Sequence, residues 1–223
     1  MKRRPMSAGR FSSVIFDFDY TLADSSPGVI ECVNYALQKL GFPARSPDAI
    51  RALIGLSLAQ TYRELSGDRS GECFAEFEEH FVKRGDQVML QSIHLFDTVR
   101  PTAQALLAEG LTLAIVSTKY RRRIVAVLER EGLKDAFAVV VGGEDVPTPK
   151  PDPSGLKAAL ARLSTAPAEA LYVGDSAVDA ETARRAGVPF AAVLSGVTSR
   201  ETLATYEPYA ILDDLTALPE MVL

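Results

Sequence analysis

From Leu95 onward, stretches with helical periodicity alternate with short strands made almost entirely of apolar residues. Strands that are apolar on both faces are typical of a parallel sheet with helices packed on each side. The pattern therefore predicts an α/β fold with a doubly wound, Rossmann-like parallel sheet. The expected strands are 12–17, 111–117, 138–141, 171–173 and 190–193, and the expected helices are 102–109, 121–131, 153–163 and 177–186.

The segment between the first expected strand and the rest of the sheet shows helical patterns and no convincing strand alternation. One helix is expected to begin after Asp24, with Ser26 as its cap and Pro27 in its first position. Further helices are expected at 47–53, 58–65 and 71–90. We therefore expect a small α-helical cap of residues 24–94, inserted after the first strand of an α/β core formed by residues 1–23 and 95–223.

Composition and charge exclude several classes of function. The formal net charge of -5 argues against a dedicated nucleic-acid binder, which needs clustered positive charge. No apolar run is long enough to cross a bilayer, and the basic segment 1–10 lacks the long apolar region of a secretory signal. We expect a disordered lead-in at 1–10 and a cytoplasmic protein, a monomer or homodimer, with no membrane or nucleic-acid partner.

Two carboxylates, Asp17 and Asp19, directly follow the first expected strand. Ligands of open parallel sheets bind outside the carboxyl ends of the strands. Two carboxylates one residue apart at such an end can share an oxygen-seeking cation such as magnesium, and one of them could attack phosphorus. Acidic residues are also common in ordinary loops, so this pair alone is a weak indication of catalysis.

A second acidic pair, Asp175 and Asp179, follows the strand expected at 171–173. Gly174, between that strand and Asp175, allows the backbone to approach other groups closely. Capping of the next helix by Asp175 or Ser176 would explain one of these residues but not the pair. The second pair therefore strengthens the hypothesis of a cation site at the sheet edge.

Two further polar features follow strands of the expected sheet. Ser117 and Thr118 end the strand at 111–117, where their hydroxyls and backbone amides could hold phosphate oxygens at a helix start. Lys150 lies between two prolines, which restrict the backbone and could aim its ammonium group at a phosphate. Each feature is common by itself, and most lysines are simply solvated.

Together these four features resemble, in order and in structural setting, the four motifs of the haloacid dehalogenase superfamily. Residues 17–25 read DFDYTLADS and residues 173–179 read VGDSAVD, and the resemblance covers the chain from about Phe11. The helical insert is similar to the small cap of that family. Within the superfamily, the chain looks most like the phosphoglycolate phosphatase-like branch.

The resemblance implies a phosphatase that works through a covalent intermediate. Asp17 would attack phosphorus to form an aspartyl-phosphate, and Asp19 would protonate the leaving oxygen and later activate water. Ser117 and Lys150 would bind the transferring phosphoryl group and balance its charge.

The resemblance also implies a Mg2+ cofactor. The ion would be held by the Asp17 carboxylate, the Asp19 backbone carbonyl and Asp175, and Asp179 would support the site or Lys150. A cation is needed there because a dianionic ester is repelled by an anionic nucleophile.

Three positions concern the substrate. Tyr20 stands where the family usually has glycine, so its phenol is expected to narrow the pocket or contact the substrate. Thr118 stands where asparagine is commoner and is a candidate substrate contact. Arg51, in the cap sequence RALIGL, is a candidate anchor for a distal anion, although a solvated helix arginine is the favoured interpretation.

The expected substrate is a small phosphorylated metabolite, with a 2-phosphoglycolate-like acid as the family default. The residues leave open a β-phosphoglucomutase-like phosphosugar mutase, an inorganic pyrophosphatase or a nucleotidase on the same core. A non-catalytic binding protein also remains an alternative, because a fold alone does not determine function.

Overall fold

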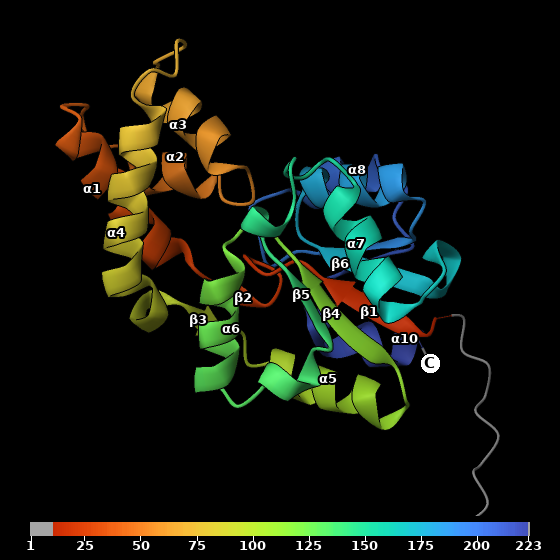
Figure 1. Cartoon of the computed structure of the whole chain (residues 1–223). Coiled ribbons are helices and arrows are strands. Elements are labelled where there is room, and N and C mark those ends of the chain that lie inside the picture. Colours follow the sequence, from red (N-terminus) through yellow and green to blue (C-terminus); the bar gives the residue numbers. More distant parts are fainter. Residues whose placement is uncertain (1–10, 223) are drawn as a thin grey trace, which may run out of the picture.

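The centre of the molecule is a six-stranded sheet in which every neighbouring pair of strands is parallel (Figure 1). The structure is a computed structural model that describes residues 11–222, so the lead-in expected at 1–10 lies outside the described residues. The strand order is β5-β4-β1-β6-β7-β8, which confirms the predicted doubly wound parallel sheet. The strands are β1 (Ser13–Phe16), β4 (Thr112–Val116), β5 (Val139–Val141), β6 (Ala170–Gly174), β7 (Phe190–Val193) and β8 (Ala210–Leu212).

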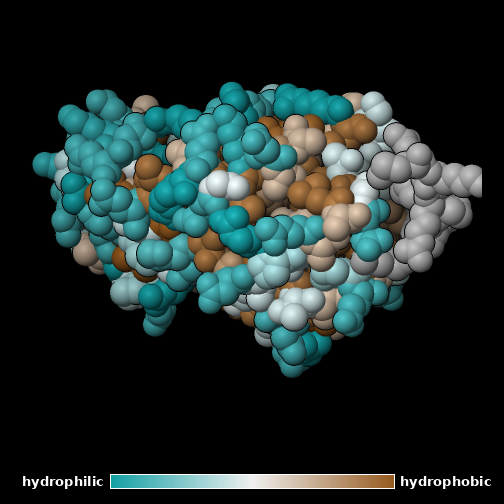
Figure 2. Space-filling view, turned by 90° about the horizontal axis from the view of Figure 1, so that it is seen from below, coloured by the Kyte–Doolittle hydropathy of each residue, from teal (hydrophilic) through white to brown (hydrophobic). Residues whose placement is uncertain are grey.

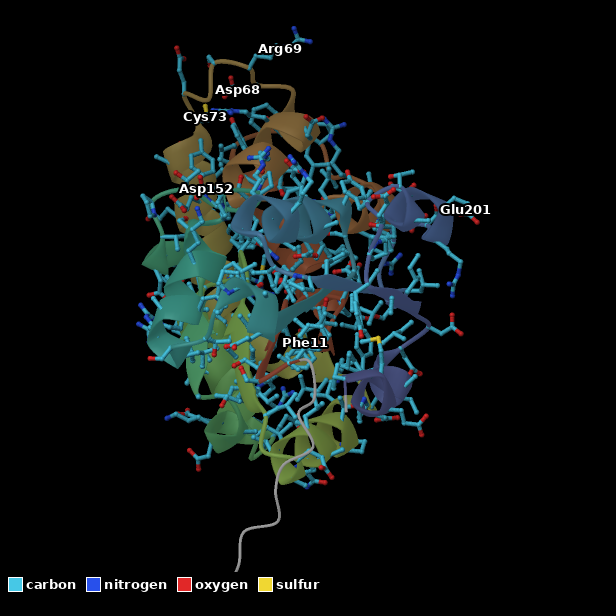
Figure 3. The ribbon with its side chains drawn as sticks, turned by 90° about the vertical axis from the view of Figure 1, so that its right-hand side faces the viewer. Phe11, Asp68, Arg69, Cys73, Asp152 and Glu201 are labelled. Carbon is cyan, nitrogen blue, oxygen red and sulfur yellow. The ribbon has the colours of Figure 1, made fainter. Side chains whose placement is uncertain are left out.

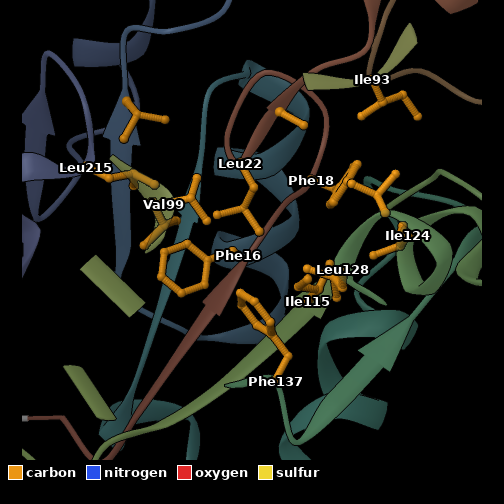
Figure 4. Close-up of a cluster of buried hydrophobic side chains, with 14 of the residues drawn as sticks. Phe16, Phe18, Leu22, Ile93, Val99, Ile115, Ile124, Leu128, Phe137 and Leu215 are labelled. Carbon is orange, nitrogen blue, oxygen red and sulfur yellow. The ribbon is translucent and has the colours of Figure 1, made fainter. Parts of the chain in front are cut away.

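Helices cover both faces of the sheet, and alternate residues of each strand point to opposite faces. Phe16 packs in a cluster with α5 (Val99–Ala108) and α6 (Arg121–Arg130), whereas its neighbour Ile15 packs in a second cluster with α7 (Ser154–Leu163) and α8 (Ala177–Ala186). Figure 4 shows part of the first cluster, in which Phe16 and Ile115 lie beside Leu128 and Phe137. The core helices are α5 (Val99–Ala108), α6 (Arg121–Arg130), α7 (Ser154–Leu163), α8 (Ala177–Ala186), α9 (Arg200–Ala204) and α10 (Leu218–Val222). Short 3-10 turns are η1 (Lys134–Ala136), η2 (Gly143–Asp145), η3 (Pro167–Glu169) and η4 (Leu215–Ala217).

Four helices form the cap between β1 and β4. They are α1 (Ser26–Lys39), α2 (Pro47–Arg51), α3 (Leu58–Ser66) and α4 (Phe74–Ser92). The buried ring of Tyr62, on α3, packs against α4 and the segment after α1, with ring centroids 4.9 Å from Phe77 and 6.2 Å from Phe42. Figure 3 shows Asp68 and Cys73 at the end of the cap that lies away from Phe11. The domain boundaries at residues 24 and 94 stay a prediction.

A short ribbon leads into and out of the cap. Strand β2 (Ala23–Asp24) pairs antiparallel with β3 (His94–Leu95). Two residues per strand are too few for a hydrophobic period to show, so the sequence patterns did not predict this ribbon. It brings both ends of the cap to one place beside β1.

The predicted start of α1 is wrong in one respect. Ser26 is the first helical residue and not its cap, and its backbone N–H donates a hydrogen bond of 2.8 Å to the Asp24 carboxylate. The residue before it, Ser25, makes no cap hydrogen bond and instead donates its hydroxyl to Asp19 at 2.5 Å. Pro27 is consequently the second helical residue and not the first, although it still lies in the first turn.

The surface differs between the two parts of the molecule. In the view from below, hydrophilic residues dominate at the cap end, whereas hydrophobic residues gather over the core (Figure 2). Within residues 11–222, no helix combines the length and the apolar character needed to cross a bilayer.

Candidate active site

The carboxyl ends of the central strands bring the predicted residues to one edge of the sheet. Asp17 follows β1, Ser117 follows β4 and Asp175 follows β6, and β1 lies between the other two strands. All three residues are buried. The backbone N–H of Asp17 donates to the Val173 carbonyl at 2.8 Å, which continues the ladder to the site. Parallel pairing therefore assembles these residues where such folds bind ligands.

Three buried carboxylates form a cluster at this edge. Asp17, Asp175 and Asp179 each offer an oxygen, and these oxygens lie within 4.8 Å of one another. Asp179 lies in the first turn of α8. Its Oδ2 accepts a hydrogen bond of 2.6 Å from the hydroxyl of Ser176, the N-terminal capping residue of α8. A Cβ on Gly174 would lie 2.5 Å from the Asp179 side chain, so glycine is required for this close approach.

Lys150 provides a positive charge within the cluster. Its Nζ lies 2.8 Å from Asp17 Oδ1 and 2.6 Å from Asp179 Oδ1, and the lysine is buried. Burial lowers the pKa of Lys150, but the charges of Asp17 and Asp179 raise it well above its ordinary value. Lys150 is therefore held as a cation beside the predicted nucleophile.

One lysine does not balance three buried carboxylates. Burial raises the pKa of Asp17 to about 6, against the lowering effect of Lys150. Burial, with the charges of Asp179 and Asp17, raises the pKa of Asp175 well above its ordinary value. The excess negative charge and the all-oxygen donor set fit a hard divalent cation such as Mg2+.

Asp19 lies apart from this cluster and has its own partners. Its Oδ1 accepts hydrogen bonds from the Ser25 hydroxyl at 2.5 Å and from Lys119 Nζ at 2.9 Å. Both members of the Asp19–Lys119 ion pair are buried. The predicted metal contact of Asp19 involves its backbone carbonyl and stays a prediction.

Lys119, Tyr172 and Gly196 were not identified from the sequence. The Tyr172 hydroxyl accepts a hydrogen bond of 3.2 Å from Lys150 Nζ and donates one of 3.0 Å to Asp179 Oδ1. A tyrosine in an otherwise apolar strand was a usable signal for it. A Cβ on Gly196 would lie 1.9 Å from Asp175 Oδ2, which no local pattern indicates.

The residues after β4 divide between core and cap. Ser117 Oγ accepts a hydrogen bond of 3.3 Å from the Lys119 backbone N–H, at the edge that also holds Asp17. Thr118 Oγ1 donates to the Gly55 carbonyl of the cap at 3.2 Å. Thr118 thus joins the two parts of the molecule, in addition to its predicted contact with substrate.

Tyr20 and Arg51 differ in burial. Tyr20 is buried and has a positive φ of 59°, the backbone region that glycine adopts most easily. Arg51 pairs with Asp48 at 2.9 Å, and 43% of its side chain is exposed. Among the described residues, neither belongs to the walls of the main cavity.

That cavity has a volume of about 520 Å3 and lies between cap and core. Asp19, Thr118 and Lys119 form part of its core side, and α1 to α4 supply most of the opposite side. The size is within the range of sites for small organic ligands. The acidic pair of the first motif therefore faces two surroundings, with Asp17 in the carboxylate cluster and Asp19 at the cavity.

Comparisons with known proteins agree with this fold. The model of the haloacid dehalogenase-like hydrolase family matches residues 14–193. The chain is 31% identical to a phosphoglycolate phosphatase of Vibrio vulnificus (98% of this chain, 99% of the relative). It is 32% identical to the pyrophosphatase PpaX of Listeria monocytogenes (96% of this chain, 97% of the relative). A solved haloacid dehalogenase-like hydrolase from Bacteroides fragilis superposes with a TM-score of 0.90 at 39% identity, covering 93% of this chain and 99% of that one.

The chain belongs to the haloacid dehalogenase-like hydrolase family. Its similarity to the phosphoglycolate phosphatase-like branch, predicted from the motifs, is confirmed. Relatives that carry phosphatase names support a hydrolase.

Proposed function

We propose that this protein is a Mg2+-dependent phosphatase that hydrolyses a small phosphate monoester with Asp17 as the nucleophile. The observation that carries the proposal is the pairing of a buried carboxylate at the end of β1 with Lys150 at 2.8 Å, inside a cluster of three carboxylates. The relatives named phosphoglycolate phosphatase and pyrophosphatase support phosphoryl transfer to water.

In the first half of the reaction, a carboxylate oxygen of Asp17 attacks phosphorus and the bond from phosphorus to the ester oxygen breaks. The departing oxygen takes a proton from the carboxyl group of Asp19. In the second half, Asp19 accepts a proton from water as the water oxygen attacks the aspartyl-phosphate, which releases phosphate and restores Asp17. The position of Asp19 in the cavity wall supports this role toward a leaving group bound there.

Charge balance assigns roles to the neighbouring residues. Lys150 and Ser117 would hold oxygens of the transferring phosphoryl group, because they lie at the sheet edge beside Asp17. When bound, Mg2+ would offset the negative charge of ester and nucleophile, with the Asp17 and Asp175 carboxylates and the Asp19 carbonyl as ligands and Asp179 in support.

The test is phosphate release from a panel of monoesters and pyrophosphate, with Mg2+ and with chelator. We expect Mg2+-dependent release that Asp17→Asn lowers by about 10⁴-fold or more, since the nucleophile is removed. The matched control is Asp135→Asn, the same change at an exposed position, which should retain the wild-type rate. Full activity of a folded Asp17→Asn protein would show that the nucleophile is assigned wrongly.

The covalent step has a separate readout. Asp19→Asn keeps the nucleophile but loses the group that protonates the leaving oxygen and activates water. With 4-nitrophenyl phosphate, whose leaving group departs without a proton, the phosphorylated enzyme should therefore accumulate. Intact-protein mass spectrometry would then detect one added phosphoryl group. Its absence in both Asp19→Asn and the wild type, despite turnover, would favour direct attack by water.

A further inference from the structure

The main cavity has walls that are mostly apolar on the cap side. Val29 and Val33 of α1, Leu53 and Ile54 after α2, and Phe74 and Phe81 of α4 line it. Asp19 lies at the opposite side, so in the proposed reaction the leaving group would extend from Asp19 toward these side chains. Removing an apolar leaving group from water against such walls is favourable.

Both cationic side chains of the described cavity walls are already ion-paired. Lys119 Nζ contacts Asp19 Oδ1 at 2.9 Å, at the end of the cavity where the ester oxygen would lie. The Arg123 guanidinium contacts Asp86 at 3.2 Å and donates to the Val82 carbonyl at 3.0 Å. The Nε of Arg123 has no hydrogen-bond partner within residues 11–222, and it is buried from solvent.

The remaining charged groups of the walls are negative. Glu78 and Glu144 line the cavity in addition to Asp19, and Glu78 accepts a hydrogen bond of 2.9 Å from the Tyr120 hydroxyl. Arg51, the predicted anchor for a distal anion, pairs with Asp48 and is absent from the described walls. A carboxylate or phosphate on the leaving group would therefore be desolvated near like charges, without a free cationic partner.

We infer that the substrate is the phosphate monoester of an uncharged, predominantly apolar alcohol that fills much of this cavity of about 520 Å3. The inference rests on the proposed function and narrows its substrate class. The inferred substrate differs from the compounds in its relatives' names. Phosphoglycolate releases glycolate, which is small and charged, and pyrophosphate also releases a charged leaving group.

A matched pair of esters tests the inference directly. Benzyl phosphate and 4-carboxybenzyl phosphate share an aromatic leaving group and differ in one carboxylate. We expect kcat/KM to be at least about tenfold higher for benzyl phosphate, mostly through KM, because the carboxylate is buried unpaired. Along ethyl, butyl and hexyl phosphate, kcat/KM should rise by up to about fourfold per added methylene, the ratio that corresponds to about 0.8 kcal/mol of transfer free energy.

Binding of the corresponding phosphonates gives a readout that does not depend on turnover. Calorimetric titration should show tighter binding of benzylphosphonate than of 4-carboxybenzylphosphonate. The variant Ile54→Lys adds a cation to the cavity wall and should shift selectivity toward the carboxylated compound by about tenfold or more. Leu90→Lys, the same type of change on the exposed side of α4, should leave the selectivity ratio unchanged.

The outcomes separate the two claims. Asp17-dependent turnover with equal or better use of the carboxylated ester would overturn the substrate inference and leave the phosphatase proposal standing. No turnover of any ester would overturn the proposed function, and the inference would fall with it. If Ile54→Lys does not fold, Leu56→Lys repeats the test from another wall position. An unchanged selectivity in a folded variant of this pair would contradict the assigned cavity.

Discussion

Single charges dominate the behaviour of the site at the residue scale. Asp17 and Asp19 are separated by one residue, yet Asp17 faces Lys150 and two carboxylates whereas Asp19 faces Ser25 and Lys119. Two carboxyl groups in different surroundings can play different parts in catalysis, one as a nucleophile and the other as a general acid and base. The Lys119 ion pair therefore has a direct bearing on how Asp19 is positioned.

Replacing Lys119 by methionine should lower kcat by about tenfold to 100-fold with little change in KM. The reason is that methionine keeps the length of the side chain but no longer holds the Asp19 carboxylate at the cavity. Steady-state kinetics with the best substrate measures the effect. Lys134→Met is the control, because Lys134 makes an exposed ion pair with Glu129. A change confined to KM would assign Lys119 to substrate binding instead.

Gly196→Ala should weaken Mg2+ binding by about tenfold or more. The added Cβ would lie 1.9 Å from Asp175 Oδ2, so the carboxylate must move out of the cluster. Mg2+ titration monitored by thermal shift measures the affinity. The control is Val197→Ala, at a neighbouring residue that is 53% exposed. This variant should bind Mg2+ with the affinity of the wild type. Unchanged affinity of Gly196→Ala would argue against Asp175 as a ligand.

At the scale of elements, the contact of α4 with α6 fastens the cap to the core. The buried guanidinium of Arg123, on α6, reaches the Val82 carbonyl and Asp86 on α4. It also lies where a side chain of Gly85 would be, since a Cβ there would meet the guanidinium at 2.4 Å. The position of the cap thus depends on a glycine in the middle of a helix.

Gly85→Ala should therefore destabilise the protein by about 1–3 kcal/mol through overpacking. An alanine in a helix interior normally stabilises by about 1 kcal/mol relative to glycine, so the expected sign is the opposite of the helix-propensity effect. Urea unfolding measures the free energy of unfolding. Lys83→Ala, at an exposed position of the same helix, is the control and should change it little. Stabilisation by Gly85→Ala would show that Arg123 moves aside without cost.

For the whole molecule, we expect the carboxylate cluster to couple folding to pH and to the proposed binding of Mg2+. The pKa of Asp17 is raised in the fold to about 6 from 3.8, and that of Asp175 is raised in the same direction. An acid with a raised pKa in the folded state stabilises the fold fully below its unfolded pKa, and that contribution is lost as pH rises through the folded pKa. The cation-free protein should lose stability from this cluster between about pH 4 and pH 7.

Mg2+ at about 100 times its Kd should raise Tm by roughly 5–10 °C at pH 7.5 and by much less at pH 5, where protons compete for the carboxylates. Differential scanning calorimetry with Mg2+ and with chelator measures both values. Asp175→Asn removes a charged ligand and should reduce the shift at pH 7.5. An equal shift at both pH values would contradict the link between the cluster and Mg2+.

Local patterns in the sequence determined the sheet class, the helical insert and the polar residues at the strand ends. The strands and helices expected from periodicity agree with the structure to within a few residues, and 190–193 and 177–186 agree at both ends. Such patterns succeed because side-chain periods and helix-ending glycines act over a few residues. They also placed Asp17 and Asp175 at strand ends and Asp179 at the start of the helix that follows, and parallel pairing then brings strand ends together.

Only the tertiary structure decided which groups meet. Lys119 reaches Asp19 across 100 positions of the chain, and Gly196 makes room for Asp175. Ser25 occupies the N-cap position expected at Ser26, and its hydroxyl donates to Asp19 instead of accepting a hydrogen bond from the first turn of α1. These outcomes depend on the closing of long loops and on competition between partners that lie far apart in sequence, which local propensities do not record.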